Sequence, residues 1–274
     1  MKRIILLVLV VAFSLVVAAS AQAGGGGVES PIVIDNVPQI VGIAAGMAPD
    51  YQGSKDYKFV GAPFFKYTFW NERYVSLIGT ELNVNMVDHP WLRAGLSVNY
   101  VPGRGSSVEN VVIKDMKKID DTVEVGGFVG AEWIDPVNSR HRLSASLDYL
   151  HDVANVSNGY TITLAGRWWY PVATPVDITI GASTTWADDN YMQTYFGVTP
   201  ENVGTSGLPF FDAHKGIRDV SLIPGVVVHL SREWHVAAGF RYQYLCNDAK
   251  ESPVVKEEGN ANQWIAGLGV AYVW

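Results

Sequence analysis

Two short patterns in this chain carry residue types that hydrolytic chemistry uses. His151–Asp152 and Asp188–Asp189 lie beside polar segments, and a histidine or carboxylate in such a pair can act as a general base on a water molecule. Paired acids are also frequent in loops, where water solvates them. We therefore interpret both as loop residues and expect no catalytic residue and no enzyme activity.

Patterns for metals, cofactors and nucleophiles are missing as well. The six histidines show no spacing of the H-E-x-x-H kind, and no glycine-rich loop follows a strand and opens a helix. His141, His229 and His235 form no recognisable pair with a serine, and we expect His229 and His235 to face the interior of the fold. Cys246 is the single cysteine, so no intramolecular disulfide can form. We predict no metal and no cofactor.

The N-terminus predicts export. Residues 1–23 have a basic start, an apolar run over 4–19 and a small-residue end with Ala21 and Ala23. This is the pattern of a secretory signal peptide cleaved between Ala23 and Gly24. A single membrane-spanning helix is the less favoured alternative, because the run is short and four glycines follow it.

Composition narrows the class of the exported chain. The formal net charge is −7 at pH 7, and removal of the basic N-terminus makes it more negative, which argues against nucleic-acid binding. Beyond residue 23 no run of about 18 apolar residues could form a transmembrane helix. With 9 tryptophans and 13 tyrosines, the chain is either a periplasmic β protein or an outer-membrane β-barrel.

The last eleven residues favour the barrel. Residues 264–274 read W-I-A-G-L-G-V-A-Y-V-W, with large or apolar side chains at every second position and small residues between them. Trp264 stands at one end, and Tyr272 and Trp274 at the other. Aromatic residues near both ends of an apolar strand face are typical of a strand that crosses a bilayer. We predict that this strand closes the barrel.

The same alternation recurs along the chain. Eleven segments show it, at residues 39–47, 59–69, 74–86, 91–100, 123–133, 142–149, 160–168, 178–186, 219–230, 236–244 and 264–274. Short turns alternate with long polar loops, as in outer-membrane barrels and unlike soluble sandwiches. Bacterial barrels have an even number of strands, so one strand is miscounted within 74–100 or hidden within 29–37 or 188–212. We predict an all-β fold, a transmembrane antiparallel barrel of 12 strands over 38–274, with ten as the alternative, after a periplasmic segment at 24–37. Pro224 predicts a bulge or irregularity in its strand.

The polar face of these strands carries both signs of charge. Placed in the lumen, its candidate ion-pairing residues are Arg93, Glu124, Glu132, Arg142, Asp148, Arg167 and Arg241. A strongly ion-selective pore more often shows one sign in excess. The balance favours a narrow lumen crossed by ion pairs, with a wider water-filled channel as the alternative.

Three motifs resemble those of one protein family. P-D-Y-Q-G-S-K-D-Y at 49–57, Y-M-Q-T-Y-F-G-V-T at 191–199 and D-A-K-E-S-P-V-V at 248–255 are similar, in the same order, to segments of the MipA/OmpV family of outer-membrane proteins. Gln52 and Lys55 replace acids of the family pattern, which argues against a cation site there. Trp274 replaces the commoner terminal Phe.

We expect the motif residues to build loops. They are Pro49, Asp50, Tyr51, Gly53, Ser54, Tyr195, Phe196, Gly197, Asp248, Ser252 and Pro253, and several are turn formers. A rim that binds a ligand or partner is the alternative. Tyr51, Tyr57, Tyr191 and Tyr195 are predicted to anchor the outer rim at the membrane interface.

The resemblance implies two functions. The MipA branch is described as a scaffold that links a lytic murein transglycosylase to a murein synthase, and the OmpV branch is associated with porin-like and adhesin-like behaviour. Short periplasmic turns offer a partner little surface, whereas the balanced lumen charge favours the scaffold. Outer-membrane lipid and lipopolysaccharide are expected neighbours, and Lys114, Lys117 and Lys118 could meet lipopolysaccharide phosphates.

Overall fold

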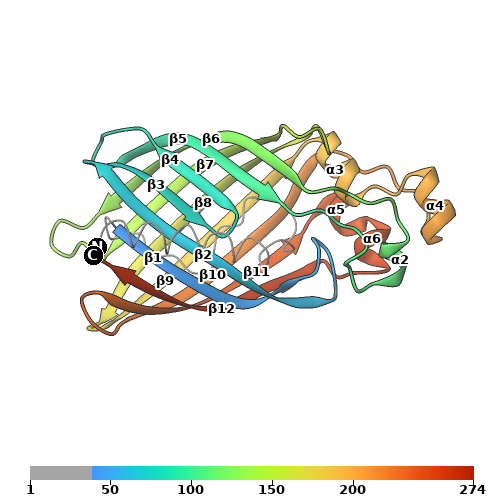
Figure 1. Cartoon of the computed structure of the whole chain (residues 1–274). Helices are drawn as coiled ribbons and strands as arrows, with labels where there is room; N and C mark the ends of the chain where they lie inside the picture. The colour runs from blue at the N-terminus through green and yellow to red at the C-terminus, as the bar shows by residue number, and fades with distance from the viewer. Residues whose placement is uncertain (1–38) are drawn as a thin grey trace, which may run out of the picture.

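The chain folds into a closed barrel in which twelve antiparallel strands follow one another around the wall and β12 pairs with β1 (Figure 1). The computed structural model describes residues 39–274. The predicted signal peptide at 1–23, its cleavage site between Ala23 and Gly24, and the segment 24–37 lie outside these residues. The prediction of an all-β, twelve-strand transmembrane barrel is confirmed.

The strands differ in length. They are β1 Gln39–Pro49, β2 Tyr57–Trp70, β3 Arg73–Ile78, β4 Glu81–Asn85, β5 Leu92–Val101, β6 Thr122–Ile134, β7 Arg142–Asp152, β8 Tyr160–Ala173, β9 Val176–Ala187, β10 Gly216–His229, β11 Trp234–Leu245 and β12 Asn262–Val273.

The alternating sequence sets the two faces of the wall. Leucines and valines such as Leu96, Leu147, Leu164 and Leu268 are exposed on the outer face, and polar side chains of the same strands are buried in the lumen. Aromatic side chains lie near both ends of the apolar surface. Towards the outer loops they include Tyr57 stacked on Trp264, with ring centroids 4.3 Å apart; at the other end they include Trp133, Trp234, Tyr272 and Trp274. This is the surface that a bilayer requires of a barrel. In the described range, no helix is long and apolar enough to cross a membrane.

One predicted strand is two strands. The segment 74–86 contains β3 and β4, joined by a tight turn at Gly79–Thr80, and this split supplies the twelfth strand. Gly79 has φ +60°, a conformation that glycine adopts without strain. Apolar residues on both sides of the turn hid it in the sequence. The β3–β4 hairpin stops partway along the wall (Figure 1).

The long outer loops carry short helices instead of a hidden strand. These are α2 Val111–Lys114, α3 Asp189–Phe196, α4 Pro200–Ser206, α5 Asn247–Glu251 and α6 Pro253–Lys256. They gather at one end of the barrel, opposite the C-terminus (Figure 1). Side-chain caps begin several of them: Asp188 accepts from the Tyr191 N–H, Thr199 from Asn202 N–H and Ser252 from Val254 N–H.

The irregularity of β10 lies mainly at Arg218. The register between β9 and β10 shifts between Ile217 and Asp219, so Arg218 is an extra residue in β10. At Pro224 the ladder to β11 is interrupted without a change of register, because proline has no N–H to donate. The predicted irregularity at Pro224 is confirmed, but the bulge is at Arg218.

Candidate functional site

The three family-like motifs meet over the outer mouth of the barrel. The side chain of Gln263 accepts from Gly53 N–H (3.1 Å) and donates to the Ser54 carbonyl (2.8 Å), which ties the first motif to β12. The Ser252 hydroxyl donates to the Phe196 carbonyl (2.5 Å), which ties the third motif to the second. We call the loops and helices that these bonds join the outer cap; it comprises residues 50–56, 102–121, 188–215 and 246–261.

A buried arginine holds the 102–121 loop of the outer cap against its other loops. Arg104, after β5, donates from Nη1 to the Tyr195 carbonyl at 2.9 Å, and its guanidinium lies 5.6 Å from the ring centre of Tyr51. All three side chains are buried. Burial lowers the pKa of Arg104 to about 10 and raises the pKa of Tyr51 to about 12; it raises the pKa of Tyr195 as well.

Apolar side chains fill the outer cap from wall to wall. Val101 at the end of β5 and Leu245 at the end of β11 belong to one buried cluster, although five strands lie between them in either direction around the ring. Tyr191, Met192 and Phe196 of α3 lie between them in that cluster and are fully buried. A second cluster above it includes Tyr51, Met116, Leu208 and Val254. The mouth is therefore closed by a small hydrophobic core.

An ion pair that the sequence analysis missed supports α3 from below. Arg218 donates from Nε to Asp219 Oδ2 at 2.6 Å and from Nη1 to the Tyr191 hydroxyl at 2.8 Å, and all three side chains are buried. The bulge turns two consecutive residues inward, which strict alternation forbids. The break in alternation between Ile217 and Val220 was the available signal.

Many side chains on the lumen face below the outer cap are buried. Inward-facing polar side chains are buried on most strands, among them Ser97, Asn99, Glu124, Thr161, Thr185, Asp219, Arg241 and Gln263. An apolar cluster with Ile40, Phe64, Trp169, Val227 and Ala271 also lies on the lumen face. Water would reach such side chains in an open channel.

The candidate lumen charges are distributed along this wall. Arg241 lies 3.9 Å from Asp219 and donates to Ser221, Glu124 accepts from Asn99 at 3.1 Å, and Asp148 accepts from Ser146 at 2.8 Å. Arg167 is half-buried in β8.

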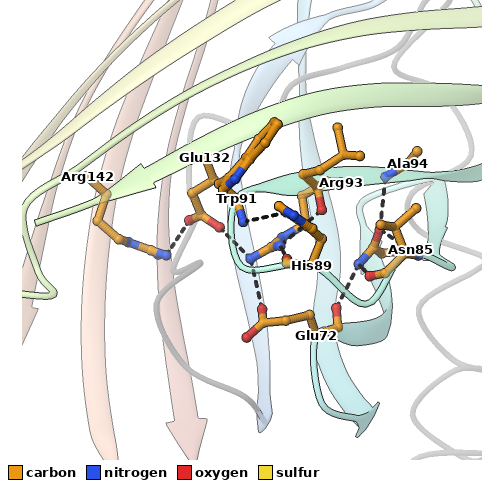
Figure 2. A network of polar contacts seen from close by, with 10 residues as sticks. Glu72, Asn85, His89, Trp91, Arg93, Ala94, Glu132 and Arg142 are labelled. Atoms are coloured by element: carbon orange, nitrogen blue, oxygen red, sulfur yellow. Dashed lines mark hydrogen bonds and ion pairs between the residues drawn. The ribbon is translucent and has the colours of Figure 1, made fainter. Parts of the chain in front are cut away.

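The remaining predicted charges gather at the periplasmic rim (Figure 2). Arg93 donates to Glu132 (3.0 Å) and to Glu72 (2.9 Å), and Arg142 donates to the other oxygen of Glu132 (2.5 Å). Arg93 also donates to the His89 carbonyl at 2.5 Å. This Arg93–Glu132 network fastens three strands and two periplasmic turns together along the wall, not across the lumen.

The neighbouring periplasmic turns are held in a similar way. Asp135 accepts from Val137 N–H (2.8 Å) and contacts His141 Nδ1 (3.2 Å), and these contacts lower its pKa. Arg140, which the sequence analysis also missed, pairs with buried Asp177, which accepts from His229 at 2.7 Å as well. Val137 at the tip of its turn is 94% exposed.

Most motif residues have structural partners. Asp50, after Pro49, accepts from Lys58 (2.8 Å) and from Glu109 N–H (2.9 Å). Asp248 accepts from His214 N–H at 2.8 Å. Gly197 ends α3, and Pro253 begins α6.

One prediction about these loops is corrected. Tyr51, Tyr191 and Tyr195 are not interfacial anchors, because they are buried in the outer cap; Tyr57 alone lies at the outer aromatic belt. The sequence pattern of turn formers did not show that the loops fold back over the mouth.

The two pairs that suggested hydrolysis organise loops. Asp152 accepts from the Thr122 hydroxyl (2.5 Å) and from Ser157 and Asn158 N–H, and Asp188 caps α3. Among residues 39–274 no three His, Cys, Asp or Glu side chains are placed to hold a metal.

The closed wall, the apolar outer face and the aromatic belts define the class as an outer-membrane β-barrel. A family model described as "MltA-interacting protein MipA" matches residues 41–274, and this chain belongs to that family. A comparison with curated proteins found no match.

Three solved structures illustrate the fold similarity. The NanC porin is 10% identical, with a TM-score of 0.48, and the match covers 86% of this chain and 100% of that chain. An outer membrane channel from Pseudomonas putida F1 is 10% identical (TM-score 0.47; 91% and 100% covered). The translocator domain of the autotransporter NalP from Neisseria meningitidis is 9% identical (TM-score 0.44; 86% and 88% covered).

Proposed function

We propose that this protein is a closed, non-enzymatic barrel that anchors a murein-acting enzyme to the outer membrane through its periplasmic face. One observation carries this proposal: the lumen face is buried and the outer cap has its own hydrophobic core from β5 to β11. A closed barrel has no open path for solutes, so its surfaces are left to make the functional contact.

The family supports the kind of partner. Its model is described by interaction with a protein, MltA. The resemblance described above makes the expected partner a lytic murein transglycosylase, with a murein synthase as a further member of the assembly. Both act on the cell wall, which the periplasmic end of an outer-membrane barrel faces.

The periplasmic rim supplies a firm surface with an apolar tip. The Arg93–Glu132 network holds the turns at Glu72 and His89 (Figure 2). Asp135 holds the turn that carries Val137. An exposed apolar side chain on a fixed turn loses little conformational entropy on binding, which favours a contact centred there. The turns are short, so we expect a contact of micromolar affinity.

Binding of the folded barrel in nanodiscs to a purified lytic murein transglycosylase tests the proposal. We expect saturable binding that Val137→Glu weakens about tenfold, which corresponds to about 1.4 kcal/mol. Val153→Glu, an exposed valine in an outer loop, is the matched control and should leave binding unchanged.

Single-channel recording distinguishes the closed anchor from the alternative, a porin-like channel. Refolded wild-type protein should give no discrete openings in a planar bilayer. Reproducible openings together with absent enzyme binding would instead make a porin-like channel the function.

A further inference from the structure

In the part of the chain that the structure describes, one edge of β2 has no neighbouring strand at membrane depth. β2 pairs with β1 along Tyr57–Tyr67, but its pairing with β3 begins only at Phe64. The last contact above the hairpin is the bond from Gly79 N–H to the Pro63 carbonyl at 2.9 Å. Within residues 39–274, therefore, Tyr57–Ala62 have a strand partner on one side only.

The bond from Gly79 N–H to the Pro63 carbonyl shows which way the main-chain N–H and C=O groups of β2 point. Main-chain groups alternate between the two edges of a strand, and Pro63 points to the β3 side. Phe59 and Gly61 have the same parity, so their N–H and C=O groups point away from β1. We call this segment, with its unpaired groups at Phe59 and Gly61, the β2 edge.

The facing strand does not close the gap. β5 pairs with β4 up to Asn99 and Glu81, and Tyr100 N–H donates to the Thr80 carbonyl at the hairpin tip. Above the tip, residues 39–274 place no strand between β2 and β5.

The β2 edge lies in the apolar zone of the wall. Tyr57 belongs to the outer aromatic belt, and Tyr67 and Phe69 lie towards the other end of the same strand. Phe59 is 71% exposed, and Leu96 and Val98 of β5 are exposed on the same outer face. A Cβ added at Gly61 would meet only the Ala44 carbonyl among residues 39–274, at 3.9 Å, so there is room beside the main chain on that face.

Unpaired main-chain groups at this depth must find a partner, because hydrocarbon offers none and each unsatisfied group costs several kcal/mol. A molecule that reaches them from the membrane needs hydrogen-bonding groups just below its head group and acyl chains to cover Phe59 and Leu96. Lipopolysaccharide of the outer leaflet has amide-linked and hydroxylated acyl chains at that level.

We propose that the β2 edge is a binding site for one lipopolysaccharide molecule, whose acyl-chain amides or hydroxyls bond the main chain at Phe59 and Gly61. The site is independent of the periplasmic contact proposed above. It makes the short β3–β4 hairpin a lipid-recognition feature of the wall.

A fluorescent reporter tests the site in the full chain. Cys246 is first replaced with Ser, and bimane is attached at Gly61→Cys or, as control, at Leu147→Cys, which is exposed on the lipid face of β7. Lipopolysaccharide added to phosphatidylethanolamine bilayers should shift bimane emission at 61 saturably, with one molecule per barrel, and leave position 147 unchanged. Equal responses at both positions, or a saturated response in phospholipid alone, would overturn the proposal.

A second variant tests the hydrogen bonds. Gly61→Pro removes an N–H that faces the gap while sparing the ladder to β1, and natural Pro63 shows that β2 accepts proline at this parity. We expect lipopolysaccharide retention in native mass spectrometry to fall at least fivefold in Gly61→Pro and in Phe59→Ala. Phe240→Ala, on the outer face of β11, should retain it. Undiminished lipopolysaccharide retention in both test variants would overturn the proposal. So would bimane attachment at Gly61→Cys that increases only when residues 24–38 are deleted, because the chain's own N-terminal part would then occupy the β2 edge.

Discussion

The guanidinium of Arg104 donates a 2.9 Å hydrogen bond to the main-chain carbonyl of Tyr195, a residue 91 positions later in the chain. The bond joins the loop after β5 to α3, so it crosses the outer mouth. Because both groups are buried, neither can exchange its partner for water. The closed state of the barrel depends on contacts of this kind.

Arg104→Ala should loosen the outer cap. The change removes a charged donor and leaves the Tyr195 carbonyl unpaired, a loss of about 1.5–3 kcal/mol. We expect discrete openings in planar-bilayer recordings and faster trypsin cleavage within 188–215. Lys114→Ala, at an exposed position of α2 in the same cap, should do neither. An Arg104→Ala barrel that shows no openings and resists trypsin would mean that the apolar clusters alone keep the mouth closed.

The ion pair under α3 predicts strong coupling. Arg218→Met leaves Asp219 buried near Arg241 alone, and loss of one partner of a buried pair costs about 3–5 kcal/mol. The double variant Arg218→Met/Asp219→Asn should recover part of that loss in urea unfolding from lipid vesicles. Additive effects of the two single changes would contradict a coupled pair.

Replacing glycine with alanine should have opposite effects on stability at two positions of the outer cap. Gly53 has φ +94°, and a Cβ there would meet Val255 Cγ2 at 2.6 Å, so Gly53→Ala should destabilise the cap by about 1–3 kcal/mol. Gly204 lies in α4 with open space around it, so Gly204→Ala should stabilise its helix by up to about 1 kcal/mol. Hydrogen exchange of the cap amides measures both; equal effects would contradict the geometry at Gly53.

Alkaline pH should open the outer cap. The pKa of Tyr51 is raised to about 12, so its contribution to stability is complete below the unfolded value near 10 and is lost between pH 10 and 12. Tyr191 and Tyr195 are shifted in the same direction by burial. The pKa of Arg104 is lowered to about 10, so this group makes the folded cap more stable as the pH rises from 10 to 12.5, because the unfolded chain binds more protons there. Three tyrosines lose stabilisation as the pH rises and one arginine gains it, so we expect a net loss of cap stability.

Tyrosinate absorbance checks this titration. The difference between wild type and Tyr51→Phe should show a tyrosine that ionises near pH 12. Ionisation of Tyr51 near pH 10 in the closed barrel would show that it is solvated.

The sequence was sufficient for the wall but not for the outer cap. Alternation depends on neighbours two residues apart, so lipid-facing Leu96 and lumen-facing Glu132 could both be assigned to their faces. The Gly79–Thr80 turn was missed because apolar residues continue across it. Closure depends on contacts such as Arg104–Tyr195, whose partners are distant in the chain, and no local pattern encodes them.

The periplasmic rim was partly predictable for the same reason. Arg93, Glu132 and Arg142 follow the alternation of adjacent strands, so their common face could be assigned from the sequence. Glu72 lies in a turn, where alternation no longer fixes side-chain direction, and its contact with Arg93 required the structure.

Glu132→Gln should loosen the rim without opening the mouth. Glu132 accepts from Arg93 and Arg142 through separate oxygens, so the amide removes the charge that both cations share and can keep only one acceptor. The side chains are mostly but not fully buried, and we expect a loss of about 1–3 kcal/mol. Hydrogen exchange should rise in the turns at Glu72 and His89 and stay unchanged at α3. Glu233→Gln, in an exposed turn of the same rim, is the control. If Glu132→Gln also weakens binding of the murein enzyme and gives no channel openings, the fixed turns are part of the docking surface. Unchanged hydrogen exchange at Glu72 would show that Arg93 holds that turn without Glu132.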